Sequence, residues 1–331
     1  MKISYLDLEK EFLRILRKHG VSDDSAIPCA HEFAETTAYG VVSHGVNRFP
    51  VFIGQLDKGE VKPHANPVKV GTFGAIEKWD GQQGIGNLIA KKMMDRAMEI
   101  ASMQGIGIVA LRNTNHWMRG GSYGYQGAKK GFISICWTNS IAVMPAWGAK
   151  QCCIGTNPLI IAVPTNPITM VDMSMSMFSY GKLQNYRLAG KALPIDGGFD
   201  NEGNYTRDPA TIEANKRILP MGYWKGSGLS IVLDMIVTML SGGLSVSDIT
   251  KSGSETNVSQ IFIAIKPSNE GVTASMQKSL QDIVSYVENA EPCDPNIRPR
   301  VPGQEFEKRY RKSMTEGIEV NDSIFEKLKS L

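Results

Sequence analysis

His44 and Arg48 stand four residues apart in the segment Ser43–Pro50, with a glycine after the histidine and an apolar helical pattern after the arginine. Because proline is tolerated only in the first turn of a helix, a helix is predicted to begin near Asn47. Both side chains would then lie at a helix N-terminus, where unpaired backbone N–H groups attract an anion. A proton-donating imidazole beside a carboxylate-binding guanidinium is the pair needed to reduce the keto group of a keto acid. An ordinary helix start with a solvent-exposed arginine is the plainer interpretation.

Two further groups of residues suit anion binding. His116 and Arg119 lie in the loop 113–121, just after a predicted strand, and loops in that position often carry functional residues. Lys225 lies in a glycine-rich turn that leads into an apolar helix, a good position for binding phosphate. Each has an alternative interpretation: His116 as a structural histidine bonded to a backbone carbonyl, and Lys225 as a solvated lysine. The histidines lack the spacing of zinc ligands, so no metal is expected.

The charge pattern distinguishes the middle of the chain. Between Ile100 and Val171 there is no Asp or Glu, and the basic residues of this segment are Arg112, Arg119, Lys129, Lys130 and Lys150. Such a surface suits a carboxylate substrate or a dinucleotide pyrophosphate, while a buried sheet, where charges are scarce, is the alternative. The segment ends at Asp172, which needs a bonded partner at the end of an apolar strand. Its carboxylate would accept hydrogen bonds from ribose hydroxyls, orient a catalytic histidine or cap the next helix.

The composition is that of an ordinary globular protein. The 331 residues are 42% hydrophobic and 21% charged, and the net charge of +3 is too small to indicate a nucleic-acid partner. The five cysteines are irregularly spaced, which favours a reducing cytoplasm over a disulfide framework. No signal-like segment begins the chain, and the longest apolar stretch, Ile231–Leu240, is interrupted by Asp234, so no membrane span is expected.

Apolar periodicities predict helices at both ends of the chain and strands in the middle. Helices are predicted at 5–18, 24–38, 47–58, 87–103, 228–240, 275–288, 305–313 and 323–331, and the helix 228–240 is expected to be buried. Two strands are predicted within 68–79, and others at 106–111, 132–136, 159–163, 168–171 and 260–265. The order predicts a mixed α+β form of the α/β class without strict βαβ alternation. We expect residues 1–120 and 270–331 to form a helical domain and residues 121–269 an inserted one.

A dinucleotide fingerprint is not established by the glycines. Gly105–Ala110 matches G-x-G-x-x-A, but it follows a predicted helix and is itself a predicted strand, whereas the fingerprint follows a strand and opens a helix. No acidic residue follows at the distance that ribose binding requires. Gly81–Gly86 does precede a helix, and it fits an anion cradle or a simple glycine turn equally well. A Rossmann fold is therefore not predicted.

Five motifs occur in order along nearly the whole chain, and together they resemble a known family. They are Ser43–Arg48, Asn115-His116, Gly155-Thr156-Asn157-Pro158, Asp172-Met173 and Tyr223-Trp224-Lys225-Gly226. The chain is similar in these motifs to the malate/L-lactate/ureidoglycolate dehydrogenases, which lack a Rossmann fold. The wider family tends to Ala-Thr-Ser after the Asp-Met pair, where this chain has Ser174-Met175-Ser176. This departure resembles a branch that acts on sugar-derived keto acids and argues against malate or lactate.

The resemblance implies a homodimer whose domain 121–269 binds NADH, or less favourably NADPH, on a mostly antiparallel sheet. It implies hydride transfer to a ketone, with His44 as the proton donor, Arg48 holding the substrate carboxylate and His116 lining the substrate site. The implied cofactor contacts are Ile168, Thr169, Met170, Val171, Asp172, Met173, Ser174, Trp224, Lys225, Gln304, Glu305 and Phe306. Gln304 replaces the histidine common in near relatives. A reductase of another 2-keto or cyclic imino acid, and a non-catalytic sugar-acid binding protein, are the alternatives.

Overall fold

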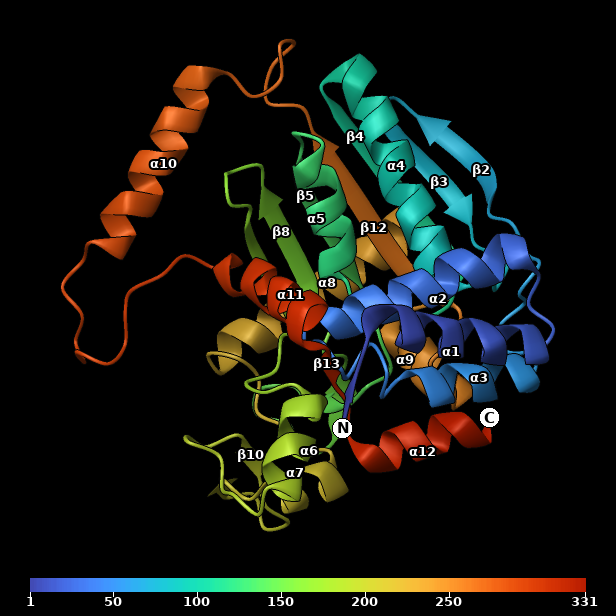
Figure 1. Cartoon of the computed structure of the whole chain (residues 1–331), viewed down its shortest axis with the longest axis vertical. Coiled ribbons are helices and arrows are strands. Elements are labelled where there is room, and N and C mark those ends of the chain that lie inside the picture. Colours follow the sequence, from blue (N-terminus) through green and yellow to red (C-terminus); the bar gives the residue numbers. More distant parts are fainter.

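The computed structural model describes residues 1–331 and is organised around one seven-stranded sheet (Figure 1). Across the sheet the strands are β2 (Val68–Phe73), β3 (Ile76–Asp80), β4 (Ile106–Thr114), β12 (Val258–Ile265), β5 (Ile133–Thr138), β8 (Leu159–Val163) and β9 (Thr169–Met173). Only β3 and β4 run parallel, and every other neighbouring pair is antiparallel. The predicted mixed α/β class with a mostly antiparallel, non-Rossmann sheet is confirmed.

One face of the sheet is buried under α4 (Gly86–Gln104) and α5 (Gly121–Lys129). Because side chains alternate along a strand, the residues in register on this face are Val109, Phe262, Cys136 and Ile160. They pack against methionines and alanines of α4 that recur at helical spacing. Asp172 is in register with Ile160, so its carboxylate faces the same helices.

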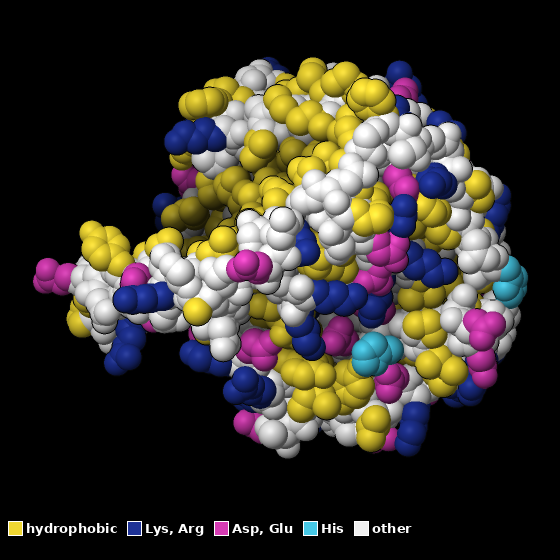
Figure 2. All heavy atoms as spheres, turned by 90° about the horizontal axis from the view of Figure 1, so that it is seen from above, with side chains coloured by type: hydrophobic (Ala, Val, Ile, Leu, Met, Phe, Trp, Pro, Cys, Tyr) yellow, Lys and Arg dark blue, Asp and Glu magenta, His cyan; other side chains and the backbone are white.

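The opposite face of the sheet is only partly covered. Here α8 (Trp224–Ser241) packs on one row of side chains, and Trp137 donates from its indole to the carbonyl of Leu233 at 3.1 Å. The next row consists of Ile108, Ile263, Ile135, Ile161 and Val171, all half-buried. In Figure 2, apolar side chains gather around a hollow beside the protruding arm.

The prediction that the helix at 228–240 is buried is wrong for one of its sides. Val232, Met235 and Met239 are 49%, 62% and 73% exposed and lie on one stripe of α8. The sequence of α8 is apolar around its whole circumference, which is typical of a fully buried helix, but a single chain covers only one side of it. No single helix is long and apolar enough to span a membrane. α8 and α9 (Val246–Ser252) have that length and apolar character only when they are taken together, and the chain bends by 85° between them.

The two ends of the chain pack together into a helical layer, as predicted. The N-terminal elements are β1 (Lys2–Ile3), α1 (Tyr5–Lys18), α2 (Asp23–Ala38) and α3 (Phe49–Asp57), and they meet β13 (Ile318–Glu319) and α12 (Asp322–Ser330). β1 pairs with β13 in antiparallel fashion, and Phe325 and Leu328 of α12 join the core formed by the first three helices. Phe12, Phe33 and Phe49 form the aromatic centre of this core.

The remaining elements flank the sheet, except for one helix. β6 (Met144–Pro145) pairs with β7 (Cys152–Ile154), and β10 (Gly198–Phe199) pairs with β11 (Tyr205–Thr206) beside α6 (Tyr180–Leu188) and α7 (Pro209–Asn215). α11 (Gln304–Glu316) packs near α2, whereas α10 (Ala274–Glu288) projects from the body as an arm (Figure 1). The sheet contains β2–β4, which precede residue 120, as well as strands from 121–269. The division of the chain into domains at residues 120 and 270 stays a prediction.

Candidate active site

A cavity of about 380 Å³ lies where the loops after α2 and β4 meet the ends of β5, β8 and β9. Its wall brings together residues that are far apart in the sequence. Of the residues singled out above, it contains His44, Arg48, His116, Arg119, Asp172, Ser174 and Phe306. Two histidines and two arginines therefore converge on one cavity, which we refer to below as the active-site cavity.

The turn that carries His44 and Arg48 is fixed by a close contact with α2. A Cβ atom added at Gly45 would lie 2.3 Å from Thr37 Oγ1, so only glycine fits. The same hydroxyl accepts a hydrogen bond from the backbone N–H of Val46 at 3.0 Å. α3 begins at Phe49 with Pro50 in its first turn, two residues later than predicted. His44 therefore lies in the turn before the helix, and Arg48 occupies the N-cap position without a side-chain capping hydrogen bond.

The two histidines face each other, and both are neutral in this state. Their rings are stacked with centroids 5.7 Å apart. Burial first, and then the positive charges of Arg48 and Arg119, lower the pKa of His44 to about 4. Burial also holds the pKa of His116 well below its usual value. His116 Nδ1 accepts the backbone N–H of Met118 at 3.0 Å, so a neutral His116 carries its proton on Nε2.

Arg48 is held by a carboxylate that the sequence did not single out. Its Nη2 donates to Glu255 Oε2 at 3.0 Å, and both side chains are about three-quarters buried. The Nε of Arg48 has no partner and is shielded from solvent. Glu255 also lines the active-site cavity. A single glutamate in a polar loop after α9 has no local signal that would distinguish it from a surface residue.

Asp172 faces the start of α5 rather than either histidine. Its Oδ2 accepts the backbone N–H of Gly121 at 3.1 Å, and α5 lies earlier in the chain than Asp172. The interpretation that Asp172 caps the next helix is therefore wrong, since that helix is α6 and Ser179 caps it. A Cβ atom at Gly121 would lie 2.4 Å from that oxygen, which explains the glycine. Burial raises the pKa of Asp172, while the Arg119 guanidinium and the Gly121 hydrogen bond lower it.

Hydroxyl side chains make up much of the remaining wall of the cavity. They are Ser43, Thr138, Ser140, Thr156, Ser174, Ser176, Ser179 and Tyr180. The Gly155–Pro158 motif supports this wall from behind, because Asn157 Oδ1 accepts the Ser140 N–H at 3.2 Å and its Nδ2 donates to the Ser230 carbonyl at 2.9 Å. Asn157 has a φ of 30°, a conformation stabilised by these bonds. The motif thus acts as a structural anchor of β8 on α8.

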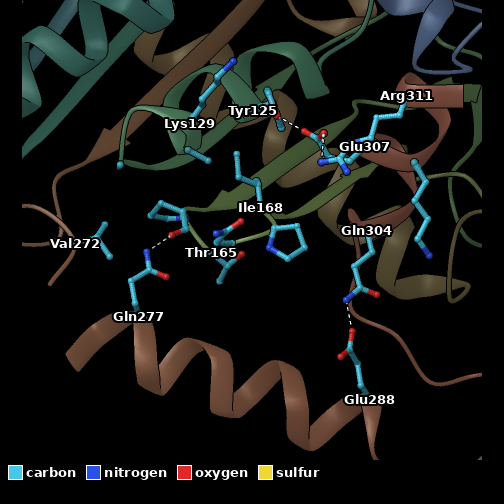
Figure 3. A pocket seen from close by; sticks show the side chains of 16 residues that line it. Tyr125, Lys129, Thr165, Ile168, Val272, Gln277, Glu288, Gln304, Glu307 and Arg311 are labelled. Atoms are coloured by element: carbon cyan, nitrogen blue, oxygen red, sulfur yellow. Dashed lines mark hydrogen bonds and ion pairs between the residues drawn. The ribbon is translucent and has the colours of Figure 1, made fainter. Parts of the chain in front are cut away.

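A second cavity of about 820 Å³ lies between α5, α11, the β8–β9 turn and the arm α10 (Figure 3). Two predicted cofactor residues, Ile168 and Gln304, line it together with Lys129 and Arg311. The arm closes its outer side, because Gln277 donates to the Pro164 carbonyl at 3.0 Å and Gln304 donates to Glu288. We refer to this space as the outer cavity.

The other predicted cofactor residues do not all reach a cavity. Met170 is buried under α5, and Thr169 Oγ1 is hydrogen-bonded to Thr165 Oγ1 at 2.9 Å. Val171 and Met173 point to the α8 side of the sheet. Glu305 pairs with Lys308 at 3.4 Å on the surface. Trp224 is 63% exposed, and neither it nor Lys225 lines either cavity of the single chain.

Comparison with known proteins agrees with this fold and shows the family. The family described as Malate/L-lactate dehydrogenase matches residues 3–329, and the chain belongs to that family. The chain is 59% identical to the 2,3-diketo-L-gulonate reductases of Klebsiella pneumoniae (strain 342) and Salmonella typhi, over 100% of this chain and of each relative.

Solved structures extend the comparison to more distant relatives. Sulfolactate dehydrogenase from Methanocaldococcus jannaschii superposes with a TM-score of 0.90 at 28% identity, covering 100% of this chain and 96% of that one. Delta1-piperideine-2-carboxylate reductase from Pseudomonas syringae pvar. tomato superposes with a TM-score of 0.87 at 26% identity, over 100% and 99%. The chain is therefore an oxidoreductase, of a family whose dehydrogenases use nicotinamide cofactors.

Proposed function

We propose that this chain reduces 2,3-diketo-L-gulonate to 3-keto-L-gulonate with NADH, and that His44 donates the proton. The observation that carries the proposal is the convergence of His44, Arg48 and His116 on one cavity with a hydroxyl-rich wall. The similarity over the whole chain to curated reductases of this substrate supports it. The bound nicotinamide would supply the hydride, and the protein side chains would bind, orient and protonate.

Arg48 is the proposed clamp for the substrate carboxylate. Glu255 fixes one edge of its guanidinium, while the buried Nε lacks a partner. A carboxylate bound there makes charge-assisted hydrogen bonds of the strong class. Its charge also offsets the effect of Arg48 on His44, so the pKa of His44 rises above about 4 when substrate is bound.

His44 and His116 then have different parts in the reduction. Hydride addition turns the keto oxygen into an alkoxide, which takes the proton from the His44 imidazolium. His116 cannot serve as the acid from Nδ1, which accepts the Met118 N–H, but its Nε2–H can donate a hydrogen bond to the developing oxyanion. General acid catalysis of this kind accelerates a reaction by about 10²–10⁴-fold.

A polyhydroxylated substrate fits the cavity better than a short keto acid. The wall provides serine and threonine hydroxyls at the end of β5 and in the loops that follow β5, β7 and β9, and each can both donate to and accept from a sugar hydroxyl. Reduction of another 2-keto acid or of a cyclic imino acid is the second candidate, since the solved relatives include a sulfolactate dehydrogenase and a piperideine-2-carboxylate reductase.

The decisive experiment follows NADH oxidation by absorbance with purified protein. 2,3-Diketo-L-gulonate, pyruvate and oxaloacetate are compared as substrates, and NADPH is compared with NADH. Preference for the diketo acid with NADH supports the proposal. Turnover of only the short keto acids would support the proposed reaction but refute 2,3-diketo-L-gulonate as the substrate. Turnover of none of the three would favour a non-catalytic binding protein.

We also propose that the protein is a cytoplasmic homodimer that buries the exposed stripe of α8. The apolar surface that a second copy would cover consists of this stripe and of the half-buried row on the same side of the sheet, which is Ile108, Ile263, Ile135, Ile161 and Val171. All five cysteines are free, which suits a reducing compartment. Trp224 and Lys225 begin α8, so any contact they make with the cofactor would involve the region where two copies meet.

The homodimer is tested by light scattering on a sizing column. Met235→Glu places a charge in the α8 stripe and is expected to give monomers. Met103→Glu, at a methionine of α4 that is 71% exposed outside this surface, is the matched control and should leave the mass unchanged. Two copies persisting in the Met235 variant would remove α8 from the interface.

A further inference from the structure

Arg119 is a buried cation that has no partner in the protein. Its residue is only 4% exposed, and its Nε is shielded from solvent without a hydrogen bond. The guanidinium lies 4.3 Å from the centre of the Tyr39 ring and 4.9 Å from that of Phe306, so it is held between two aromatic faces. No carboxylate forms an ion pair with it, and burial lowers the pKa of the guanidinium, although Asp172 is near enough to raise it.

Burying a guanidinium in this way costs free energy unless an anion binds to it. Stacking on aromatic rings fixes the plane of a guanidinium but does not satisfy its N–H groups, which point outward from the edge. A buried guanidinium whose N–H groups lack hydrogen bonds is costly, and an anion bound at its free edge would supply those bonds. The side chain lines the active-site cavity, so its free edge is accessible to an anion there.

The location of Arg119 indicates which anion it would bind. Phe306 lines the active-site cavity and Gln304, two residues earlier on α11, lines the outer cavity. Tyr125, which lines the outer cavity, lies 6.2 Å from Tyr39 between ring centres. Figure 3 shows Tyr125 and Glu307, which both line the outer cavity, bonded to each other. Arg119 therefore lies on the side of the active-site cavity nearest α11, the helix that also borders the outer cavity.

Arg48 and Arg119 have different charged neighbours. Arg48 lowers the pKa of both His44 and His116, and it is paired with Glu255. Arg119 is close enough to His44 to lower its pKa, and its own charged neighbours are Asp172 and the α2 residues Glu35 and Glu32. The first position suits the reacting acid, and the second suits an anion farther from the reacting carbon.

We propose that Arg119 binds the pyrophosphate of the dinucleotide, an inference that rests on the proposed use of NADH. With a nicotinamide in the active-site cavity and an adenosine in the outer cavity, the doubly charged pyrophosphate that joins them would pass α11 close to Arg119. The planar fork of arginine can donate two parallel hydrogen bonds to phosphate oxygens, and Tyr39 and Phe306 hold the fork in place before the ligand arrives. None of the cofactor contacts implied by the resemblance includes this residue.

The test measures binding rather than turnover. NADH, ADP-ribose and adenosine are titrated by calorimetry into the full-length protein and into its Arg119→Met and Arg119→Lys variants. Loss of hydrogen bonds to a charged group is expected to weaken NADH and ADP-ribose by about ten- to hundred-fold in Arg119→Met. Adenosine, which has no phosphate, should bind as before, and Arg119→Lys should lie in between.

The matched control is Arg309→Met, which removes the same charge from an exposed position of α11 and should change none of the three affinities. Unchanged NADH and ADP-ribose affinity in Arg119→Met, with a raised KM for the keto acid, would assign the guanidinium to the substrate and overturn the inference. Equal weakening of adenosine would also overturn it, because the change would then be one of cavity shape. A wild-type protein that binds neither NADH nor ADP-ribose would instead refute the proposed function itself.

Discussion

The pKa of His44 leads to an unusual pH dependence for the reduction. An ordinary imidazole titrates near 6.5, whereas the pKa of His44 is lowered to about 4 by burial and by two arginines. If the imidazolium is the acid, the reactive form of the free enzyme is its protonated form. The group is therefore fully active below pH 4 and loses activity at every higher pH.

The size of the effect follows from the fraction protonated. Between pH 5 and pH 6 the protonated fraction of a group with a pKa of about 4 falls about tenfold. The protonated fraction of a group with a pKa of about 6.5 falls by less than about twofold over the same interval. Because kcat/KM reports the pKa values of the free enzyme, log kcat/KM for the keto acid should fall with a slope close to −1 from pH 5 to pH 8. The bend in kcat should lie at higher pH, since the bound carboxylate raises the pKa of His44.

The assay is initial-rate NADH oxidation at saturating NADH in buffers of constant ionic strength. His44→Gln, which cannot donate a proton in this range, should remove the slope along with most of the rate. A profile of kcat/KM that is flat from pH 5 to pH 6 and bends near 6.5 would refute the reasoning, because it would mean that neither burial nor the arginines act on the catalytic acid.

Three other substitutions test separate parts of the structure. His44→Ala should lower kcat by about 10²–10⁴-fold with NADH affinity unchanged by calorimetry, and the exposed His64→Ala should change neither; an unaltered kcat would exclude His44 as the acid. Arg48→Met should raise KM for the keto acid by about ten- to hundred-fold. Arg112→Met, which also breaks an arginine–carboxylate pair but outside the cavity, should leave KM unchanged. Equal KM values in the two variants would show that Arg48 does not bind the substrate carboxylate. Gly45→Ala should lower the free energy of unfolding by about 1–3 kcal/mol in thermal or urea melts, because its Cβ would meet Thr37 Oγ1 at 2.3 Å, while Gly54→Ala, with open space around it, should not be destabilising.

Much of the secondary structure was predictable because it depends on local periodicity. The helix predicted at 87–103 is observed at Gly86–Gln104, since Met93, Met94 and Ala97 recur at helical spacing on its buried side. The pairing of the strands was not predictable, because the neighbours of β12 come from distant parts of the chain. The exposure of Met235 and Met239 was also hidden, since composition does not tell whether an apolar face is covered by the same chain or by another.

The site was predictable where a motif carried it and not elsewhere. His44, Arg48 and His116 do meet in one cavity, but Glu255, which holds Arg48, was missed because it stands alone in a polar loop. The cofactor contacts were expected along the continuous segment 168–174. Strand alternation divides that segment, so Asp172 faces α5 while Val171 faces the opposite side of the sheet. Which of these residues contact the cofactor stays a prediction.

The central position of β12 has a consequence for how the protein is made. β12 joins β4 to β5, so the three strands β2, β3 and β4 and the three strands β5, β8 and β9 have no direct pairing with each other. About 120 residues separate the end of β5 from β12. A ribosome adding about 5–20 residues per second needs roughly 6–24 s to cover that distance. During this interval the nascent chain presents two open strand edges, at β4 and at β5, and these are surfaces that pair readily with other chains. Until β12 is made, the stability of the finished sheet therefore cannot protect these two edges from pairing with other chains.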